Sequence, residues 1–120
     1  MNPVTNQDSL SMKIKKLGEK IQIKQTEYDN KVEECKRDVK IQENILKILD
    51  EKKHELEEKR RSKGLSPTEY ESSKLIEIQR SVAEKMRKKA LKNLNKAQEK
   101  RDKELVKLQR KLDSLNVQLI

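Results

Sequence analysis

The side chains that most often carry chemistry in proteins are scarce in this chain. It has one cysteine, Cys35, and one histidine, His54. Nothing around either residue resembles a metal-ligand spacing, and no Ser/His/Asp or Cys/His set can assemble. We therefore expect no enzymatic activity, no metal and no cofactor, with Cys35 packed as a small apolar residue and His54 exposed.

Lysine is the residue type whose spacing indicates a binding surface. Seven lysines in the second half of the chain recur in steps of four and three, which places them on one helix face over about 33 Å. This lysine stripe consists of Lys85, Lys89, Lys92, Lys96, Lys100, Lys103 and Lys107. It fits an acidic protein surface better than sequence-specific nucleic acid, because no aromatic platform, Gly-rich phosphate loop or recognition module accompanies it. The alternative is that these lysines only keep a coiled coil solvated.

The composition excludes a compact sheet or layered core. Among 120 residues, 32% are apolar and 42% are charged, and Phe and Trp are absent. Globular chains have roughly 45–50% apolar and 25% charged residues. The net charge is +9, and residues 63–120 hold 15 basic against 8 acidic residues. Regular apolar spacing in such a charged chain is typical of long helices and coiled coils.

Residues that break helices gather at one internal place in the chain. Gly64 suits the left-handed position after a helix, Ser66 suits an N-cap, and Pro67 suits the first helical position. Glu69 completes a capping box with Ser66. These signals predict a flexible segment over 1–8, one helix over 9–62, a turn over 63–66 and a second helix over 67–120.

Both predicted helices carry a heptad-like apolar seam. If the second helix folds back on the first, each step forward along one helix faces a step backward along the other. The residue numbers of every facing pair then add up to the same sum. That sum is 129 over most of the length and 131 nearer the turn, where Leu49 would face Val82 and Ile45 would face Met86. The predicted hairpin seam is Leu10, Ile14, Leu17, Ile21, Val32, Cys35, Val39, Leu49, Val82, Met86, Ala90, Leu94, Ala97, Leu108, Leu112, Leu115 and Leu119. The prediction is an all-α fold, a long antiparallel helical hairpin that forms a two-stranded coiled coil.

Two other architectures compete with this hairpin. A parallel homodimer of uninterrupted helices would place Arg101 against Arg101 and leave the capping box without a role. A three-helix bundle would need a second break near Asp29 and Asn30, where there is neither Gly nor Pro.

Several apolar residues have no place in a two-helix seam. The stretch 39–49 is apolar over more than half of its circumference. We expect Ile41, Ile45, Ile48 and Ile76 to dock a further helix from a second copy or from another protein, in a larger bundle or oligomer. The alternative is that these are scattered exposed aliphatic residues without a partner.

These features predict a non-enzymatic structural or scaffold subunit that mediates protein–protein assembly. A single cysteine, the lack of a signal peptide and the lack of a transmembrane segment favour an intracellular complex, in the cytoplasm or nucleus. One alternative is a regulated module whose side recognises a folded protein; in outline the hairpin is similar to the antiparallel coiled-coil fingers with which Rho effectors hold small GTPases. Another is an electrostatic binder of nucleic acid, a membrane or an acidic cytoskeletal protein through the lysine stripe.

Overall fold

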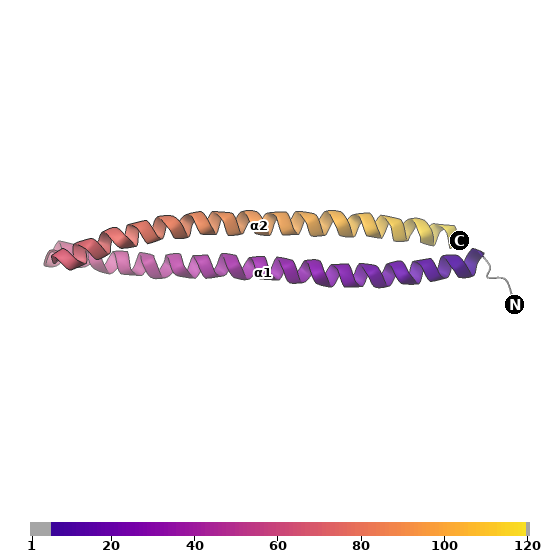
Figure 1. Cartoon of the computed structure of the whole chain (residues 1–120), viewed down its shortest axis with the longest axis horizontal. Helices are drawn as coiled ribbons and strands as arrows, with labels where there is room; N and C mark the ends of the chain where they lie inside the picture. The colour runs from indigo at the N-terminus through magenta and orange to yellow at the C-terminus, as the bar shows by residue number, and fades with distance from the viewer. Residues whose placement is uncertain (1–5, 120) are drawn as a thin grey trace. The chain divides into compact units, whose positions relative to one another are not determined.

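The chain folds into two long helices joined by a short turn. The computed structural model describes residues 6–119, in which α1 spans Asn6–Ser62 and α2 spans Pro67–Leu119 (Figure 1). No strand occurs within these described residues. The predicted all-α antiparallel helical hairpin is confirmed.

The first helix begins earlier than the sequence indicated. Residues 6–8 are already helical, whereas the expectation placed them in a flexible N-terminal segment. Asp8 lies in the first turn of α1, where its negative charge favours the positive end of the helix dipole. The rest of that predicted segment, residues 1–5, lies outside the described residues.

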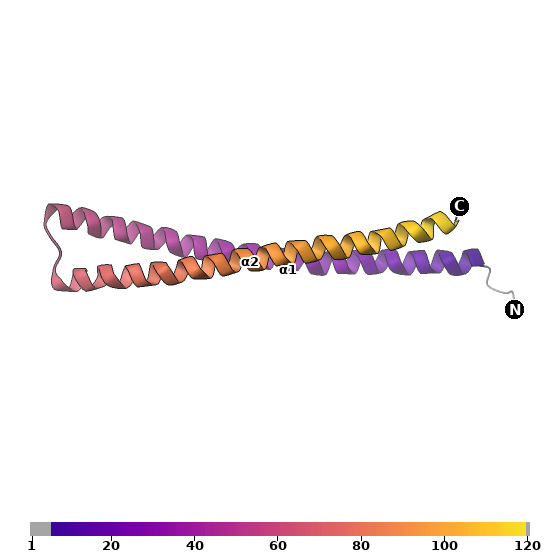
Figure 2. The same cartoon turned by 90° about the horizontal axis from the view of Figure 1, so that it is seen from above.

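The two helices are divided between two compact units. The turn unit is Glu34–Leu94 and contains the connection between the helices; the terminal unit combines Met1–Glu33 with Asn95–Ile120. In each unit a segment of α1 is paired with an antiparallel segment of α2, as the two views of the ribbon show (Figures 1 and 2).

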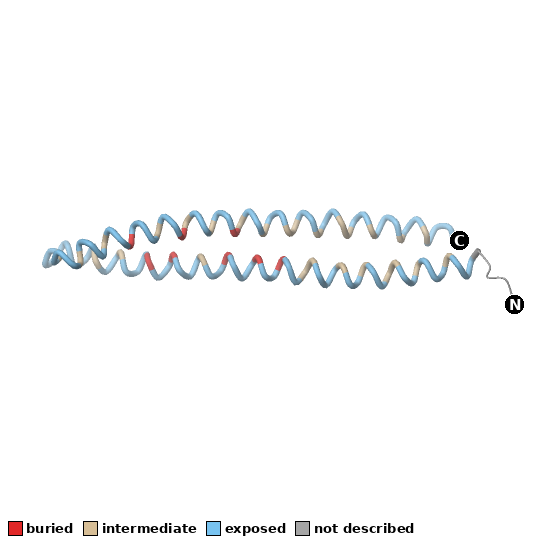
Figure 3. Tube along the Cα trace, viewed as in Figure 1, coloured by how far each residue is buried: buried red, intermediate tan, exposed pale blue. Residues whose placement is uncertain are grey.

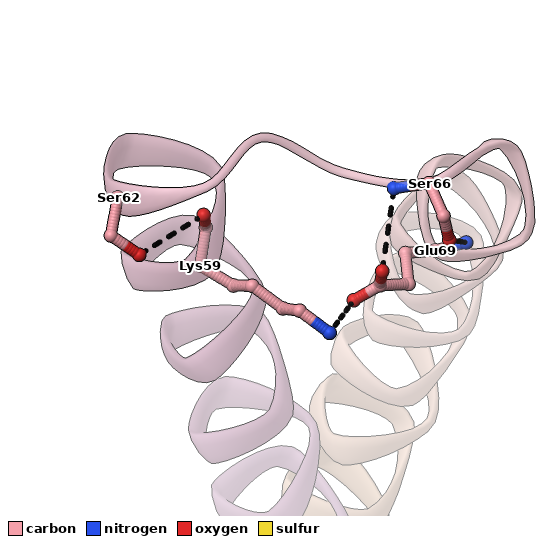
Figure 4. Close-up of polar contacts among 4 residues, drawn as sticks. All are labelled: Lys59, Ser62, Ser66 and Glu69. Atoms are coloured by element: carbon pink, nitrogen blue, oxygen red, sulfur yellow. Dashed lines mark hydrogen bonds and ion pairs between the residues drawn. The ribbon is translucent and has the colours of Figure 1, made fainter.

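The turn has the backbone conformation that its sequence predicts. Gly64 has a φ of 75°, and its N–H donates to the carbonyl oxygen of Arg60 at 3.3 Å. This bond is the single 5→1 hydrogen bond of an αL helix end, and glycine adopts it without a Cβ penalty. On the other side, the Glu69 N–H donates to Ser66 Oγ at 3.2 Å while the Ser66 N–H donates to Glu69 Oε1 at 3.3 Å (Figure 4). These two bonds form the predicted capping box.

The buried residues of the turn unit form a single seam between its helices (Figure 3). They are Cys35, Val39, Leu46 and Leu49 on α1, with Ile76, Ala83 and Ala90 on α2. Half-buried positions complete the α2 seam at Arg80 and Arg87, so that it advances in steps of four and three. Leu46 and Ala83 belong to one core cluster, and their numbers sum to 129. The register is therefore the same here as the sequence predicted farther from the turn.

Two predicted seam residues near the turn are placed wrongly by the sequence pattern. Val82 is 51% exposed and Met86 is 50% exposed, so neither lies in the seam. Each directly precedes the residue that does, Ala83 or Arg87. A seam must keep its spacing to keep facing the partner helix, and that requirement outweighs the size of individual side chains.

Ile76 was expected to dock a further helix, and this is also wrong. It is 8% exposed and packs with Leu46, Leu49 and Ala83 in the core of the turn unit. Its burial stabilises the hairpin itself, so it is not available to a partner.

The terminal unit is held by a less deeply buried seam. Val32 is its most buried residue, at 1% exposed, and Ala97 is half-buried. The other residues of this unit that the sequence predicted in the seam are also half-buried: Leu10, Ile14, Leu17, Ile21, Leu108, Leu112, Leu115 and Leu119. Leu94, at the edge of the turn unit, is also half-buried.

The heptad spacing is interrupted once in the terminal unit, at matching places on both helices. Partly or fully buried residues are spaced by two successive steps of four at Lys24, Tyr28 and Val32 on α1. On α2 the same double step occurs at residues 97, 101 and 105. Such an insertion of four residues locally unwinds a coiled coil, and its presence on both helices preserves their register.

Candidate docking face

One flank of the turn unit exposes a group of large apolar side chains. We call these residues the apolar face: Ile41, Ile45 and Ile48 on α1, and Leu75, Ile78, Val82 and Met86 on α2. Each is at least 39% exposed. All except Ile78 directly precede a seam residue of their helix. In an antiparallel pair the residues that precede the seam lie on the same side, so both helices contribute to one face.

Two adjoining grooves show that the helices share this face. The larger has a volume of about 430 Å³ and is lined by Gln42, Ile45, Leu49, Ile78, Gln79, Val82, Ala83 and Met86. The second, of about 390 Å³, is lined by Asp38, Ile41, Gln42, Met86, Lys89, Ala90 and Asn93. Met86 and Gln42 line both grooves, so the two lie side by side.

The opposite flank of the turn unit is charged. Arg80 Nε lies 2.6 Å from Asp50 Oδ1, and Arg87 Nε lies 3.7 Å from Glu43 Oε1. Asp50 and Glu43 each directly follow a seam residue, so both lie on the side away from the apolar face. The hydrogen bond to Asp50 raises the pKa of the Arg80 guanidinium, which stays charged throughout the accessible pH range.

The spacing of the apolar face is that of a helix-binding surface. Ile41, Ile45 and Ile48 recur in steps of four and three, and Val82 follows Leu75 by seven residues. This is the pattern of a second heptad seam beside the first. The α2 part, Leu75 to Met86, extends over about 16 Å at 1.5 Å per residue, the length of about three helical turns.

The lysine stripe is exposed along its whole described length. Lys85, Lys89 and Lys92 belong to the turn unit, and the other four lysines belong to the terminal unit. Within residues 6–119, none of the seven ammonium groups forms an ion pair or hydrogen bond with another side chain. Lys89 lines the second groove together with Ile41 and Met86, so the stripe meets the apolar face at this point.

The remaining candidate residues form no second site. Cys35 is a free, buried thiol in the seam, and His54 is exposed, with its Nε2 3.1 Å from Glu58 Oε1. In the described part of the chain, no group of three or more His, Cys, Asp or Glu residues has the arrangement of a metal site. Over the same residues, neither helix contains a stretch long and apolar enough to span a bilayer.

No protein-family model, curated protein or solved structure matches this chain.

The sequence pattern identified the α1 half of the apolar face and missed most of the α2 half. Ile41, Ile45 and Ile48 are exposed, where docking was predicted, but Val82 and Met86 had been assigned to the seam. Keeping the sum of 129 up to the turn would have placed Ala83 opposite Leu46 and left Val82 on the flank. A constant register was therefore the sequence signal that could have identified the α2 half of the apolar face.

Proposed function

We propose that this protein is a non-enzymatic coiled-coil subunit of an intracellular assembly, and that its apolar face binds a further helix. The observation that carries the proposal is the exposure of seven large apolar side chains on one flank of the turn unit, opposite a flank of ion pairs. An apolar patch of this kind on a coiled coil marks an interaction surface.

Burial of this face would supply a substantial driving force for assembly. Fully burying an exposed isoleucine, valine, leucine or methionine side chain gains about 1.5–3 kcal/mol, and the apolar face has seven such side chains. Binding also costs translational and rotational freedom, so only the surplus appears as affinity. A single free cysteine in the seam, with no second cysteine to pair with, supports an intracellular location.

A second candidate function is electrostatic binding of an anionic surface through the lysine stripe. It is favoured by the seven exposed ammonium groups without ion-pair partners in residues 6–119. Phosphate-type binding of this sort would weaken steeply as salt is raised and would not require the apolar face.

The test is the size of the native complex in cells that express charged variants of the full chain. Ile45→Glu with Val82→Glu places two carboxylates on the apolar face, and we expect the chain to sediment as the free protein. Lys47→Glu with Lys88→Glu, at exposed positions off that face, is the matched control and should leave the complex intact. Circular dichroism checks that both variants remain helical. A complex of unchanged size in the Ile45→Glu, Val82→Glu variant would contradict the proposal.

A further inference from the structure

We infer that the helix bound by the apolar face is an acidic amphipathic helix of a different protein, whose carboxylates pair with Lys85 and Lys89. This inference rests on the proposed function, because it names the chemistry of the partner for the same face. It follows from the charges at the edge of the face, the length of the face and the net charge of the chain.

The α2 edge of the apolar face is basic. Lys89 lines the second groove beside Met86 and directly precedes the seam residue Ala90, as Val82 precedes Ala83. Lys85 is also exposed, and it lies seven residues after Ile78, which lines the larger groove, so it has the same heptad position as Ile78 at this edge. Asp38 is the acidic residue among those that line this groove, on its α1 side. An approaching helix therefore meets apolar side chains at its centre and two ammonium groups at its α2 side.

The carboxylates that pair with Arg80 and Arg87 across this unit lie on the other flank. Asp50 and Glu43 pair there with Arg80 and Arg87, so they are not positioned to neutralise Lys85 or Lys89. Neither lysine has an ion-pair partner within residues 6–119. Two ammonium groups four residues apart on a helix match two carboxylates at the same spacing on a partner helix.

The dimensions of the face fit a short helix. Its α2 part extends over about 16 Å, which corresponds to about three turns. An isolated helix of that length is marginally stable in water, so the partner segment gains its order on binding. Apolar residues at steps of three and four on such a segment would occupy the two adjoining grooves, which share Met86.

A second copy of this chain fits the same face less well. Each copy carries a net charge of +9 and the same unpaired lysines, so self-association would bring like charges together. An acidic helix lets apolar burial and charge pairing act in the same direction. Phosphate groups would satisfy the lysines but would leave the apolar grooves exposed to water.

The test uses the full chain and two designed peptides of about 21 residues, each with leucine at the a and d positions of three heptads. One peptide carries glutamate at the flanking positions, and the other carries lysine. We expect fluorescence anisotropy to show binding of the acidic peptide about tenfold tighter than the basic one, from two attractive pairs replaced by two repulsive ones. Raising the salt from about 0.1 M to about 1 M, which shortens the screening length from about 10 to about 3 Å, should shrink that preference.

Charge reversal on the protein assigns the contact to the named lysines. Lys85→Glu with Lys89→Glu should invert the preference, so that the basic peptide binds more tightly. The control is Lys88→Glu, an exposed neighbour that follows the seam residue Arg87 and so lies toward the charged flank; it should leave the preference unchanged. Ile45→Glu should abolish binding of both peptides.

Four results besides a failure of both peptides to bind would overturn the inference. They are equal binding of the two peptides, no effect of Lys85→Glu with Lys89→Glu, a dimer of the chain that Ile45→Glu dissociates, and lysine-dependent binding to anionic lipid vesicles that does not require Ile45. If neither peptide binds while Ile45→Glu with Val82→Glu still releases the chain from its cellular complex, the inference fails and the proposed function stands.

Discussion

Arg80 on α2 donates a hydrogen bond from Nε to Asp50 Oδ1 on α1 at 2.6 Å, across thirty positions of the chain. Arg80 occupies a seam position, yet its guanidinium reaches out to the charged flank. The long apolar stem of arginine allows this, because such a stem can lie along an apolar seam while the charged group stays in water. The same register explains both this contact and the exposed apolar face. It places Arg80 in the seam, and it places Val82 and Met86 on the flank beside the seam.

Because Arg80 occupies a seam position, we expect its apolar stem and its charged guanidinium to contribute separately to the stability of the hairpin. Arg80→Ala removes both the stem and the ion pair, whereas Asp50→Ala removes only the ion pair, which is exposed to solvent and screened by salt. We expect Arg80→Ala to lower the free energy of unfolding more than Asp50→Ala, as measured by urea denaturation. Equal losses, both abolished by high salt, would show that the stem does not pack.

The register predicts opposite behaviour for two isoleucines that are two residues apart. Ile76 is 8% exposed in the core, and Ile78 is 62% exposed on the apolar face. Ile76→Ala should lower the free energy of unfolding of the isolated chain by about 2–4 kcal/mol, because it leaves a cavity. Ile78→Ala should change it by less than about 0.5 kcal/mol. The reverse order in chemical denaturation would contradict the register.

The sequence could predict the turn because its signals are local. The conformation of Gly64 and the capping box of Ser66 and Glu69 depend on neighbouring residues only, and the structure has both. The seam of the terminal unit was also predictable, since its α2 half is a regular series of leucines from Leu105 to Leu119.

The register near the turn was harder to predict, for a physical reason. Arg80 and Arg87 occupy seam positions there, while larger apolar side chains lie directly before seam residues. A pattern weighted by side-chain hydrophobicity therefore selects Val82 and Met86. It also treats Ile76 as surplus to the seam, although it is core. Only the constancy of heptad spacing distinguishes the two arrangements.

Replacing each of the two glycines with alanine should change the free energy of unfolding in opposite directions. Gly64 has a φ of 75°, so Gly64→Ala should lower the free energy of unfolding by about 1–2 kcal/mol through backbone strain alone, since the added Cβ would meet no atom within 4 Å apart from those of residue 64 and its chain neighbours. Gly18 is inside α1 with equally open space, so Gly18→Ala should raise it by about 1 kcal/mol. Thermal unfolding of both variants checks the pair. A stabilising Gly64→Ala would mean that the turn is not left-handed at this residue.

The capping box predicts that the free energy of unfolding decreases as the pH is lowered. Hydrogen bonds from Lys59 and Ser66 lower the pKa of the Glu69 carboxyl below its ordinary value of 4.5 (Figure 4). Because the folded pKa is the lower one, the contribution of Glu69 is fully present above the unfolded pKa and is lost as the pH falls through the folded pKa. We expect Glu69→Gln to reduce stability at neutral pH and to flatten its decrease between neutral and acidic pH.

The control for this pH dependence is Glu71→Gln, at an exposed position two residues farther along α2. It should leave the acid-dependent loss of stability in place. If Glu69→Gln and Glu71→Gln give superimposable profiles of unfolding midpoint against pH, the capping box does not account for the dependence.

Helix α2 pairs with α1 in one constant register, which places Ile45, Val82 and Met86 on a common flank. An engineered disulfide tests this register most directly. In a Cys35→Ala background, the cysteines of Leu46→Cys and Ala83→Cys should oxidise to a crosslink within one chain, because these positions pack in the same core and a disulfide requires Cβ atoms about 3.5–4.5 Å apart. Leu46→Cys with Lys88→Cys, whose second position is exposed, is the comparison pair. The predicted result on a non-reducing gel is a crosslinked monomer for the first pair and none for the second. Crosslinks only between two chains, or only in the second pair, would contradict the account.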